Sequence, residues 1–179
     1  MRSISLGIRV AVGMASLLFL TTAWGICSNR STYFEVNADS VYDKKTDLTW
    51  MRCTFGKTWK NGLGCVGMAT KVFARDSFKF RNLEGTDAAG STTKGWRVPS
   101  RDELLSIVNH HCPPDFGLVP KATIDNEIFP DTPAEYFLTH QPGYPEFCQL
   151  LSFIDGLSFQ KCNRWPYQVF SLRLVRNGK

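Results

Sequence analysis

The sequence predicts an α+β domain stabilised by disulfides. Residues 68–83 and 100–109 space their apolar side chains as amphipathic helices do. Residues 148–162 alternate in polarity on either side of Ile154-Asp155-Gly156, which is typical of a β-hairpin. The chain also has six cysteines, an even number that is typical of a disulfide framework. Helices and hairpins in one short chain indicate the α+β class.

The first 25 residues predict a secretory signal peptide. Arg2 and Arg9 supply a positive region, residues 10–20 are apolar, and Ala23-Trp24-Gly25 places small residues before the expected cleavage. An apolar run of this length is too short to span a membrane, and no later stretch is apolar enough to do so. We therefore expect residues 26–179 to form a single domain of an exported protein, periplasmic or extracellular, with no transmembrane segment.

The charge of the chain argues against a nucleic-acid partner. The sequence has 21 basic and 16 acidic side chains, and removal of Arg2 and Arg9 leaves a net charge near +3. Nucleic-acid-binding domains are usually far more basic. Export argues in the same direction.

All six cysteines follow the expected cleavage site, and an oxidising compartment favours three disulfides. Cys53 and Cys65 enclose a Gly-rich segment that is predicted to be a loop, so we expect a local bridge between them. The run His110-His111-Cys112 resembles a set of metal ligands, but no CxxC or HxxxH spacing supports it. We therefore predict no metal site.

The pairing of the other four cysteines depends on the hairpin turn. A three-residue loop with Gly156 in the left-handed conformation places Cys148 opposite Cys162. A two-residue Asp-Gly loop places Cys148 opposite Asn163 instead. The first alternative predicts a Cys148–Cys162 bridge and leaves Cys27 to pair with Cys112.

Further strands are predicted along the chain. Residues 33–41 are extended, and residues 43–47 form a turn into a second strand through Leu48 and Trp50. Another strand is expected at 136–139, and residues 167–177 are expected to form the strand that closes the domain.

Residues 68–83 are ambiguous, because Phe78 and Phe80 alternate as in a strand while the other apolar residues follow a helical face. We favour the helix. It would place Lys71, Arg75 and Lys79 in one basic stripe with Arg81 nearby. Such a stripe is either a solvated outer face or a patch for an anionic polymer.

Residues 95–108, GWRVPSRDELLSIV, predict a helix that begins with a capping box. Ser100 can accept a hydrogen bond from the amide of Glu103, and Glu103 can accept one from the amide of Ser100. Asp102 lies in the first turn, where a negative charge suits the helix dipole. Arg97 either braces the preceding turn through a salt bridge or contacts a ligand.

No arrangement typical of an enzyme is found. The three histidines are not spaced as bases for a serine or cysteine nucleophile, and no G-x-S-x-G motif is present. Asp102 and Glu103 are neighbours on a helix and diverge by about 100°, so they do not form a glycosidase pair. There is no P-loop or dinucleotide motif. We therefore expect a protein that is not an enzyme and has no cofactor.

Four segments resemble the Lcl C-terminal domain family, named for the C-terminal domain of the Legionella collagen-like adhesin. They are VYDKKTDLTWMRC, GWRVPSRDELLSIV, IDNEIFPDTPAEYFLT and the terminal SLRLVRNGK, and the resemblance covers residues 34–179. It implies a C-type-lectin-like domain with two helices packed on twisted antiparallel hairpins, and with the N- and C-terminal strands close together. In the adhesin this domain is associated with binding of sulphated glycosaminoglycans and with trimerisation.

The resemblance and the charges together predict a non-enzymatic binding module, adhesin-like, whose partner is an anionic glycan or surface polymer. Charge complementarity and aromatic contact would provide the binding. The residues expected to do so are Lys57, Trp59, Lys60, Lys71, Arg75, Lys79 and Arg81. The alternative is a periplasmic inhibitor or immunity protein that binds a secreted toxin.

Overall fold

The structure is a computed structural model that describes residues 32–80, 95–109, 122–141, 144–157, 159–161 and 166–179. The predicted signal peptide, Arg81, His110 and His111 lie outside this part of the chain. The same holds for the predicted Cys27–Cys112 and Cys148–Cys162 bridges, since only the backbone of Cys148 is described.

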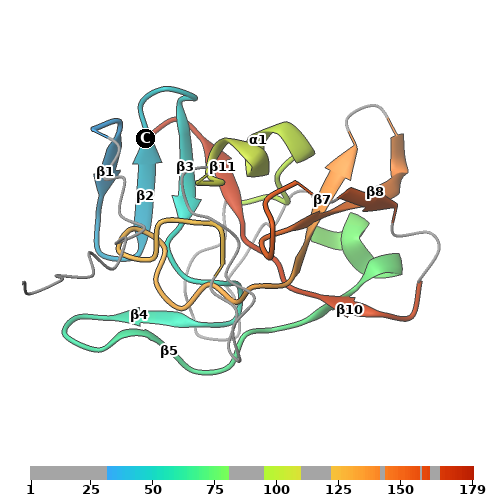
Figure 1. The fold of residues 1–179 in the computed structure, drawn as a ribbon, viewed down its shortest axis with the longest axis horizontal. Helices are drawn as coiled ribbons and strands as arrows, with labels where there is room; N and C mark the ends of the chain where they lie inside the picture. Colours follow the sequence, from blue (N-terminus) through green and yellow to red (C-terminus); the bar gives the residue numbers. More distant parts are fainter. Residues whose placement is uncertain (1–31, 81–94, 110–121, 142–143, 158, 162–165) are drawn as a thin grey trace, which may run out of the picture.

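One four-stranded antiparallel sheet joins the two ends of the domain (Figure 1). Its strands are β1 (Phe34–Val36), β2 (Ser40–Asp43), β3 (Leu48–Met51) and β11 (Val175–Asn177), in the order β1-β2-β3-β11. The predicted turn at 43–47 connects β2 to β3, and Asp43 accepts hydrogen bonds there from the amide of Lys45 and the hydroxyl of Thr46. Because β11 pairs with β3, the N- and C-terminal strands are close together, as the resemblance implied.

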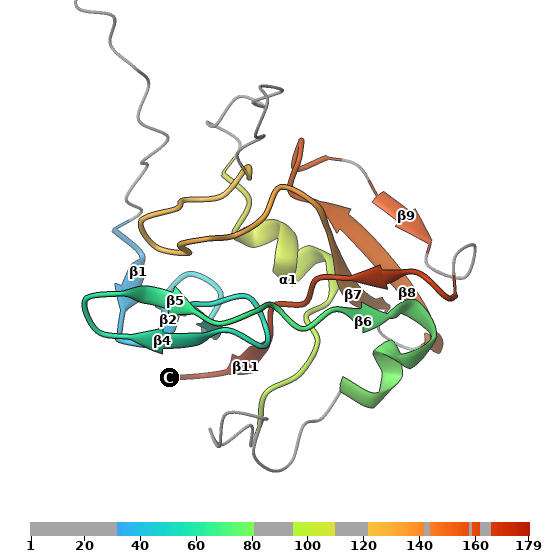
Figure 2. The same cartoon turned by 90° about the horizontal axis from the view of Figure 1, so that it is seen from below.

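Three smaller antiparallel sheets complete the described architecture. Two of them have two strands each: β4 (Thr58–Lys60) with β5 (Gly64–Val66), and β6 (Val72–Phe73) with β10 (Val169–Phe170). The third consists of β7 (Tyr136–Gln141), β8 (Tyr144–Ser152) and β9 (Phe159–Lys161). Residues 53–65, predicted as a loop, therefore contain a hairpin, and its two strands cross the end of the four-stranded sheet (Figures 1 and 2).

The predicted C-type-lectin-like fold with two packed helices is wrong. The described residues form mostly short strands in several small sheets, with a single α-helix, α1 (Arg101–Ser106), and a 3₁₀ helix, η1 (Ala74–Phe80). The expected helix over 68–83 fails because Val72 and Phe73 pair as a strand with Phe170 and Val169. Pairing with a distant strand overrides the local helical periodicity.

The hairpin predicted within 148–162 has the expected register. The pairs Gln149↔Lys161, Leu150↔Gln160 and Leu151↔Phe159 are those of the alternative that aligns positions 148 and 162. Gly156 has φ +69°, in the left-handed region, as predicted. The connection is longer than three residues, because the paired residues end at Leu151 and Phe159.

Two clusters of buried side chains form the core. The larger one packs α1 against the four-stranded sheet and the 122–129 segment, with Trp50, Leu104, Ile124 and Phe137 fully buried. The second cluster joins the β6–β10 pair to β7 and β8 through Val98, Leu138, Leu150 and Leu172. No helix in the described part of the chain is both long and apolar enough to cross a membrane.

The C-terminal segment passes between these clusters instead of forming the single strand predicted over 167–177. Between β10 and β11, Leu172 and Leu174 are fully buried and Arg173 is buried with them. The Arg173 guanidinium donates to the carbonyls of Met51 and Arg52 and to the hydroxyl of Thr132. Burial lowers the pKa of Arg173 to about 9.

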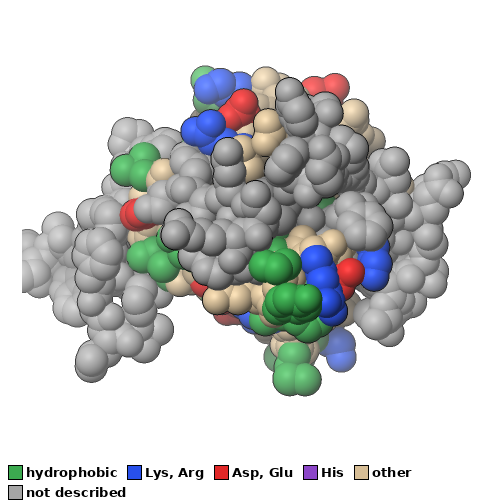
Figure 3. All heavy atoms as spheres, turned by 90° about the vertical axis from the view of Figure 1, so that its right-hand side faces the viewer, with side chains coloured by type: hydrophobic (Ala, Val, Ile, Leu, Met, Phe, Trp, Pro, Cys, Tyr) green, Lys and Arg blue, Asp and Glu red, His purple; other side chains and the backbone are tan. Residues whose placement is uncertain are grey.

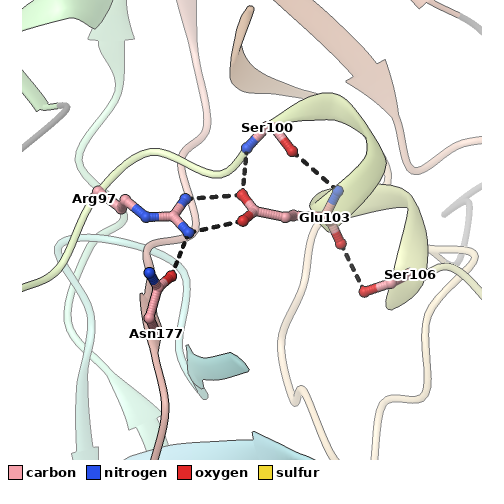
Figure 4. A network of polar contacts seen from close by, with 5 residues as sticks. All are labelled: Arg97, Ser100, Glu103, Ser106 and Asn177. Carbon is pink, nitrogen blue, oxygen red and sulfur yellow. Dashed lines mark hydrogen bonds and ion pairs between the residues drawn. The ribbon is translucent and has the colours of Figure 1, made fainter. Parts of the chain in front are cut away.

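The predicted capping box at α1 is confirmed (Figure 4). The Ser100 hydroxyl accepts from the Glu103 amide at 3.2 Å, and Glu103 accepts from the Ser100 amide at 2.7 Å. Arg97 donates to both carboxylate oxygens of Glu103, at 2.8 and 2.7 Å, and also to the side chain of Asn177 on β11. Arg97 therefore braces the turn before the helix and ties it to the C-terminal strand.

Candidate functional site

The candidate site is a pocket of about 380 Å³ between the four-stranded sheet and the β4–β5 hairpin. Side chains alternate along the sheet: Val41, Trp50 and Val175 face the core, while Ser40, Met51 and Arg176 face the pocket. Residues 53–59 form the opposite wall. The lining residues are Asp39, Ser40, Met51, Cys53, Phe55, Gly56, Lys57, Thr58, Trp59, Trp96 and Arg176.

The predicted Cys53–Cys65 disulfide is confirmed and holds the hairpin wall of this pocket. Cys65 pairs directly with Trp59 across the hairpin, so the bridge anchors the strand that carries the tryptophan. Gly56 is also required at the start of this wall. It has φ +92°, and a Cβ there would lie 2.3 Å from the backbone nitrogen of Thr70.

Trp59 is held in place by Arg52. The Arg52 guanidinium carbon lies 3.7 Å from the centroid of the Trp59 ring, a cation–π contact. The same guanidinium donates to the backbone carbonyls of Glu127, Ile128 and Ala38, so it cannot move freely. The indole nitrogen of Trp59 donates to the side chain of Asn61 at 3.0 Å. The orientation of the ring is therefore fixed before any ligand arrives.

Three charged side chains at the pocket have no ion-pair partner within the described part of the chain: Asp39, Lys57 and Arg176. The Arg176 guanidinium carbon lies 5.0 Å from the centroid of the Trp96 ring. Its Nε is buried without a hydrogen-bond acceptor. Two unpaired cations and one exposed carboxylate give the pocket a net positive charge.

The structure places the predicted ligand-binding residues in two groups at opposite ends of the long axis of the domain (Figure 2). Lys57, Trp59 and Lys60 lie on or beside β4, and Lys57 and Trp59 line the pocket. Lys71, Arg75 and Lys79 lie at β6 and η1. They do not form the predicted helical stripe, since Lys71 precedes a strand and the other two lie in a 3₁₀ helix.

Each member of the second group is near a carboxylate. Lys71 donates to Glu135 and to the hydroxyl of Ser171. Lys79 lies 2.8 Å from Asp76, and Arg75 lies 4.0 Å from the same carboxylate. Arg75 also contacts the rings of Phe73 and Tyr167, on a face where hydrophobic and basic side chains lie side by side (Figure 3). These partners reduce the positive charge available to an anionic ligand.

Sequence reasoning missed Arg176, Trp96 and Asp39. Alternation along the last strand could have placed Arg176 on the face opposite Val175. Its contact with Trp96 joins residues far apart in the sequence, and no local pattern indicates it. Arg97, one of the two possibilities left open above, braces a turn and is not among the residues that line the pocket.

The pocket offers groups suited to holding a polar ligand. Arg176 and Lys57 donate hydrogen bonds, Asp39 accepts them, the hydroxyls of Ser40 and Thr58 do both, and Trp59 and Trp96 provide aromatic surface. Pockets that combine apolar rings with a few convergent polar groups are typical of small-molecule sites.

Comparison with known proteins identifies the family. The model of the Lcl C-terminal domain matches residues 39–176, most of the chain and all of the pocket. No curated protein and no solved structure shows significant similarity to it. The match spans all four segments quoted above apart from the last residues of the chain. The chain therefore belongs to the Lcl C-terminal domain family.

Proposed function

We propose that this protein is an exported, non-enzymatic binding module that recognises an anionic glycan in the pocket between the sheet and the β4–β5 hairpin. One observation carries the proposal: Arg176 lies over Trp96 in a pocket that also contains Trp59, and it has no ion-pair partner among the described residues. A half-buried cation without a counter-ion is costly, and an anionic ligand would supply the missing charge.

The rest of the lining suits a sugar. Sugars present apolar C–H faces as well as hydroxyls, and tryptophan rings offer a flat apolar surface for such faces. Asp39, Ser40 and Thr58 provide polar atoms for the hydroxyls, and Lys57 adds a second positive charge. The arrangement therefore complements a ligand that is both acidic and rich in hydroxyls.

The family and the disulfide are consistent with this role. The Lcl C-terminal domain family is associated with an adhesin. The Cys53–Cys65 bridge is typical of proteins that mature in an oxidising compartment outside the cytosol. Both observations support an exported binding protein.

Retention on immobilised heparin, a general anionic glycan, tests the proposal. At low ionic strength the protein should bind, and added salt should weaken binding steeply because the attraction is electrostatic. Lys57→Ala should weaken binding roughly fivefold, as expected for one charge-assisted contact.

Lys79→Ala is the matched control. It removes the same charge from the other end of the molecule, where Lys79 is paired with Asp76, and it should change retention far less. Retention no greater than that of an unrelated protein of equal net charge would overturn the proposal. Equal losses in the two variants would show that the pocket has no special role.

A second candidate function, binding a protein partner such as a secreted toxin, is favoured by two exposed apolar residues near the hairpin. Leu63 at its tip is 73% exposed and Met68 just after it is 88% exposed. Exposed aliphatic side chains on a protruding hairpin suit a protein interface. A tight one-to-one complex that survives high salt and is lost in the Leu63→Asp, Met68→Asp variant would favour this alternative.

A further inference from the structure

The Arg176 guanidinium presents its edge, and not both of its faces, to a ligand. Trp96, only 7% exposed, lies on one side of it, with the guanidinium carbon 5.0 Å from the ring centroid. The guanidinium makes no salt bridge in the described part of the chain. Its free N–H groups therefore form a planar fork at the wall of the pocket.

A planar fork matches a carboxylate better than a sulfate ester. Two parallel N–H···O bonds satisfy both oxygens of a carboxylate in one plane. A sulfate ester has three terminal oxygens in a tetrahedral arrangement, so at least one of them stays outside the plane of the fork. That oxygen would share the pocket with the carboxylate of Asp39, which repels it.

The size of the pocket limits how much of a glycan enters it. A volume of about 380 Å³ lies near the lower end of the range for small-molecule sites, roughly 300–1,000 Å³. Arg52 already occupies one side of the Trp59 ring, so a ligand can contact only the remaining surface of the ring. The pocket therefore suits one or two sugar residues and not a long stretch of polymer.

We propose that the pocket recognises the carboxylate of a single uronic-acid residue, held by Arg176, while Asp39 accepts hydrogen bonds from its hydroxyls and Trp59 contacts its ring. This inference rests on the proposed function and narrows it, because the site would select glycans by carboxylate and not by sulfate. Lys57 contributes attraction without discrimination, since an ammonium group has no preferred plane.

The first test uses the wild-type protein and three probes in isothermal titration calorimetry. The probes are tri-galacturonate, the same trisaccharide with its carboxyl groups reduced to alcohols, and a sulfated galactan oligosaccharide that contains no uronic acid. Tri-galacturonate should bind, and carboxyl reduction should weaken binding at least roughly tenfold because the charge-assisted pair with Arg176 is lost. The sulfated probe should bind more weakly than tri-galacturonate although it carries comparable charge.

The second test uses Arg176→Lys, which keeps the positive charge and removes the fork. It should weaken tri-galacturonate binding roughly tenfold and leave the affinity for the sulfated probe nearly unchanged. Arg75→Lys makes the same change at the far end of the domain and should alter neither affinity. An unchanged melting temperature in both variants shows that the fold is intact, and the wild-type comparison above needs no variant.

The outcomes separate the two proposals. Equal affinity for the uronate and the sulfated probe, with no effect of Arg176→Lys, overturns the carboxylate site and leaves anionic-glycan binding standing. Binding of none of the acidic probes, together with no retention on heparin, overturns both.

Discussion

The Cys53–Cys65 disulfide should contribute about 3 kcal/mol to the stability of the domain, because the two residues are separated by 12 positions and the bridge restricts the unfolded chain accordingly. The test is the double variant Cys53→Ala, Cys65→Ala. Alanine is the suitable replacement, since both cysteines are about 5% exposed and serine would bury two hydroxyls. For a domain of this size the melting temperature should fall by roughly 6–12 °C.

The same variant should also affect the pocket. Residues 53–65 carry Lys57 and Trp59, and without the bridge the hairpin keeps only its short β4–β5 pairing. Urea denaturation followed by tryptophan fluorescence measures the stability, and calorimetry with an acidic oligosaccharide measures the affinity. Leu63→Ala, at the exposed tip of the hairpin, is the control and should leave both nearly unchanged. A loss of stability below about 1 kcal/mol would contradict the entropic reasoning.

Three further predictions concern the capping box and the pocket wall. Ser100→Ala should cost about 1 kcal/mol in urea denaturation and leave glycan affinity unchanged, since Ser100 caps α1 and does not line the pocket. Burial raises the pKa of Glu103, but hydrogen bonds from Arg97 and the Ser100 amide outweigh this effect and lower it overall. Its stabilising effect is therefore complete above its unfolded pKa of about 4.3 and is lost as the pH falls through the lower folded value. Glu103→Gln should flatten this part of the stability–pH curve, and a curve of unchanged shape would refute the account. Gly56→Ala should destabilise the domain by more than about 2 kcal/mol, because it combines positive φ with a collision against Thr70. Gly62→Ala, which also has positive φ but an open surrounding, should cost clearly less.

The features that the sequence predicted correctly are those held by interactions between near neighbours. The capping box joins Ser100 and Glu103, three residues apart, and the β8–β9 register follows from the alternation on either side of Gly156. The Cys53–Cys65 bridge closes a short loop. In each case the interacting groups lie within one short segment, so the local pattern contains the necessary information.

The features that the sequence did not predict depend on distant partners. Val72 and Phe73 leave the predicted helix because Phe170 and Val169, almost a hundred residues later, offer a strand partner. The last segment splits into β10 and β11 because its middle residues are buried between the two core clusters. The basic stripe expected at residues 71–79 disappeared with the helix that would have formed it.

The pocket was predicted in part for the same reason. Lys57 and Trp59 lie in the disulfide-closed segment that drew attention to them, and they do line the pocket. Arg176 and Trp96 come together only through the pairing of β11 with β3 and the bridge between Arg97 and Val175. Such contacts follow from the tertiary fold and leave no periodic mark on the sequence.

The most direct test of the central claim is a titration of the ¹⁵N-labelled mature protein with an acidic oligosaccharide, followed through the indole N–H signals of its tryptophans. The account predicts that the signals of Trp59 and Trp96 shift together and saturate at one ligand concentration, while Trp50, fully buried in the core, stays unchanged. Shifts confined to backbone amides around η1, or no shift of Trp59 and Trp96 at saturating ligand, would contradict it.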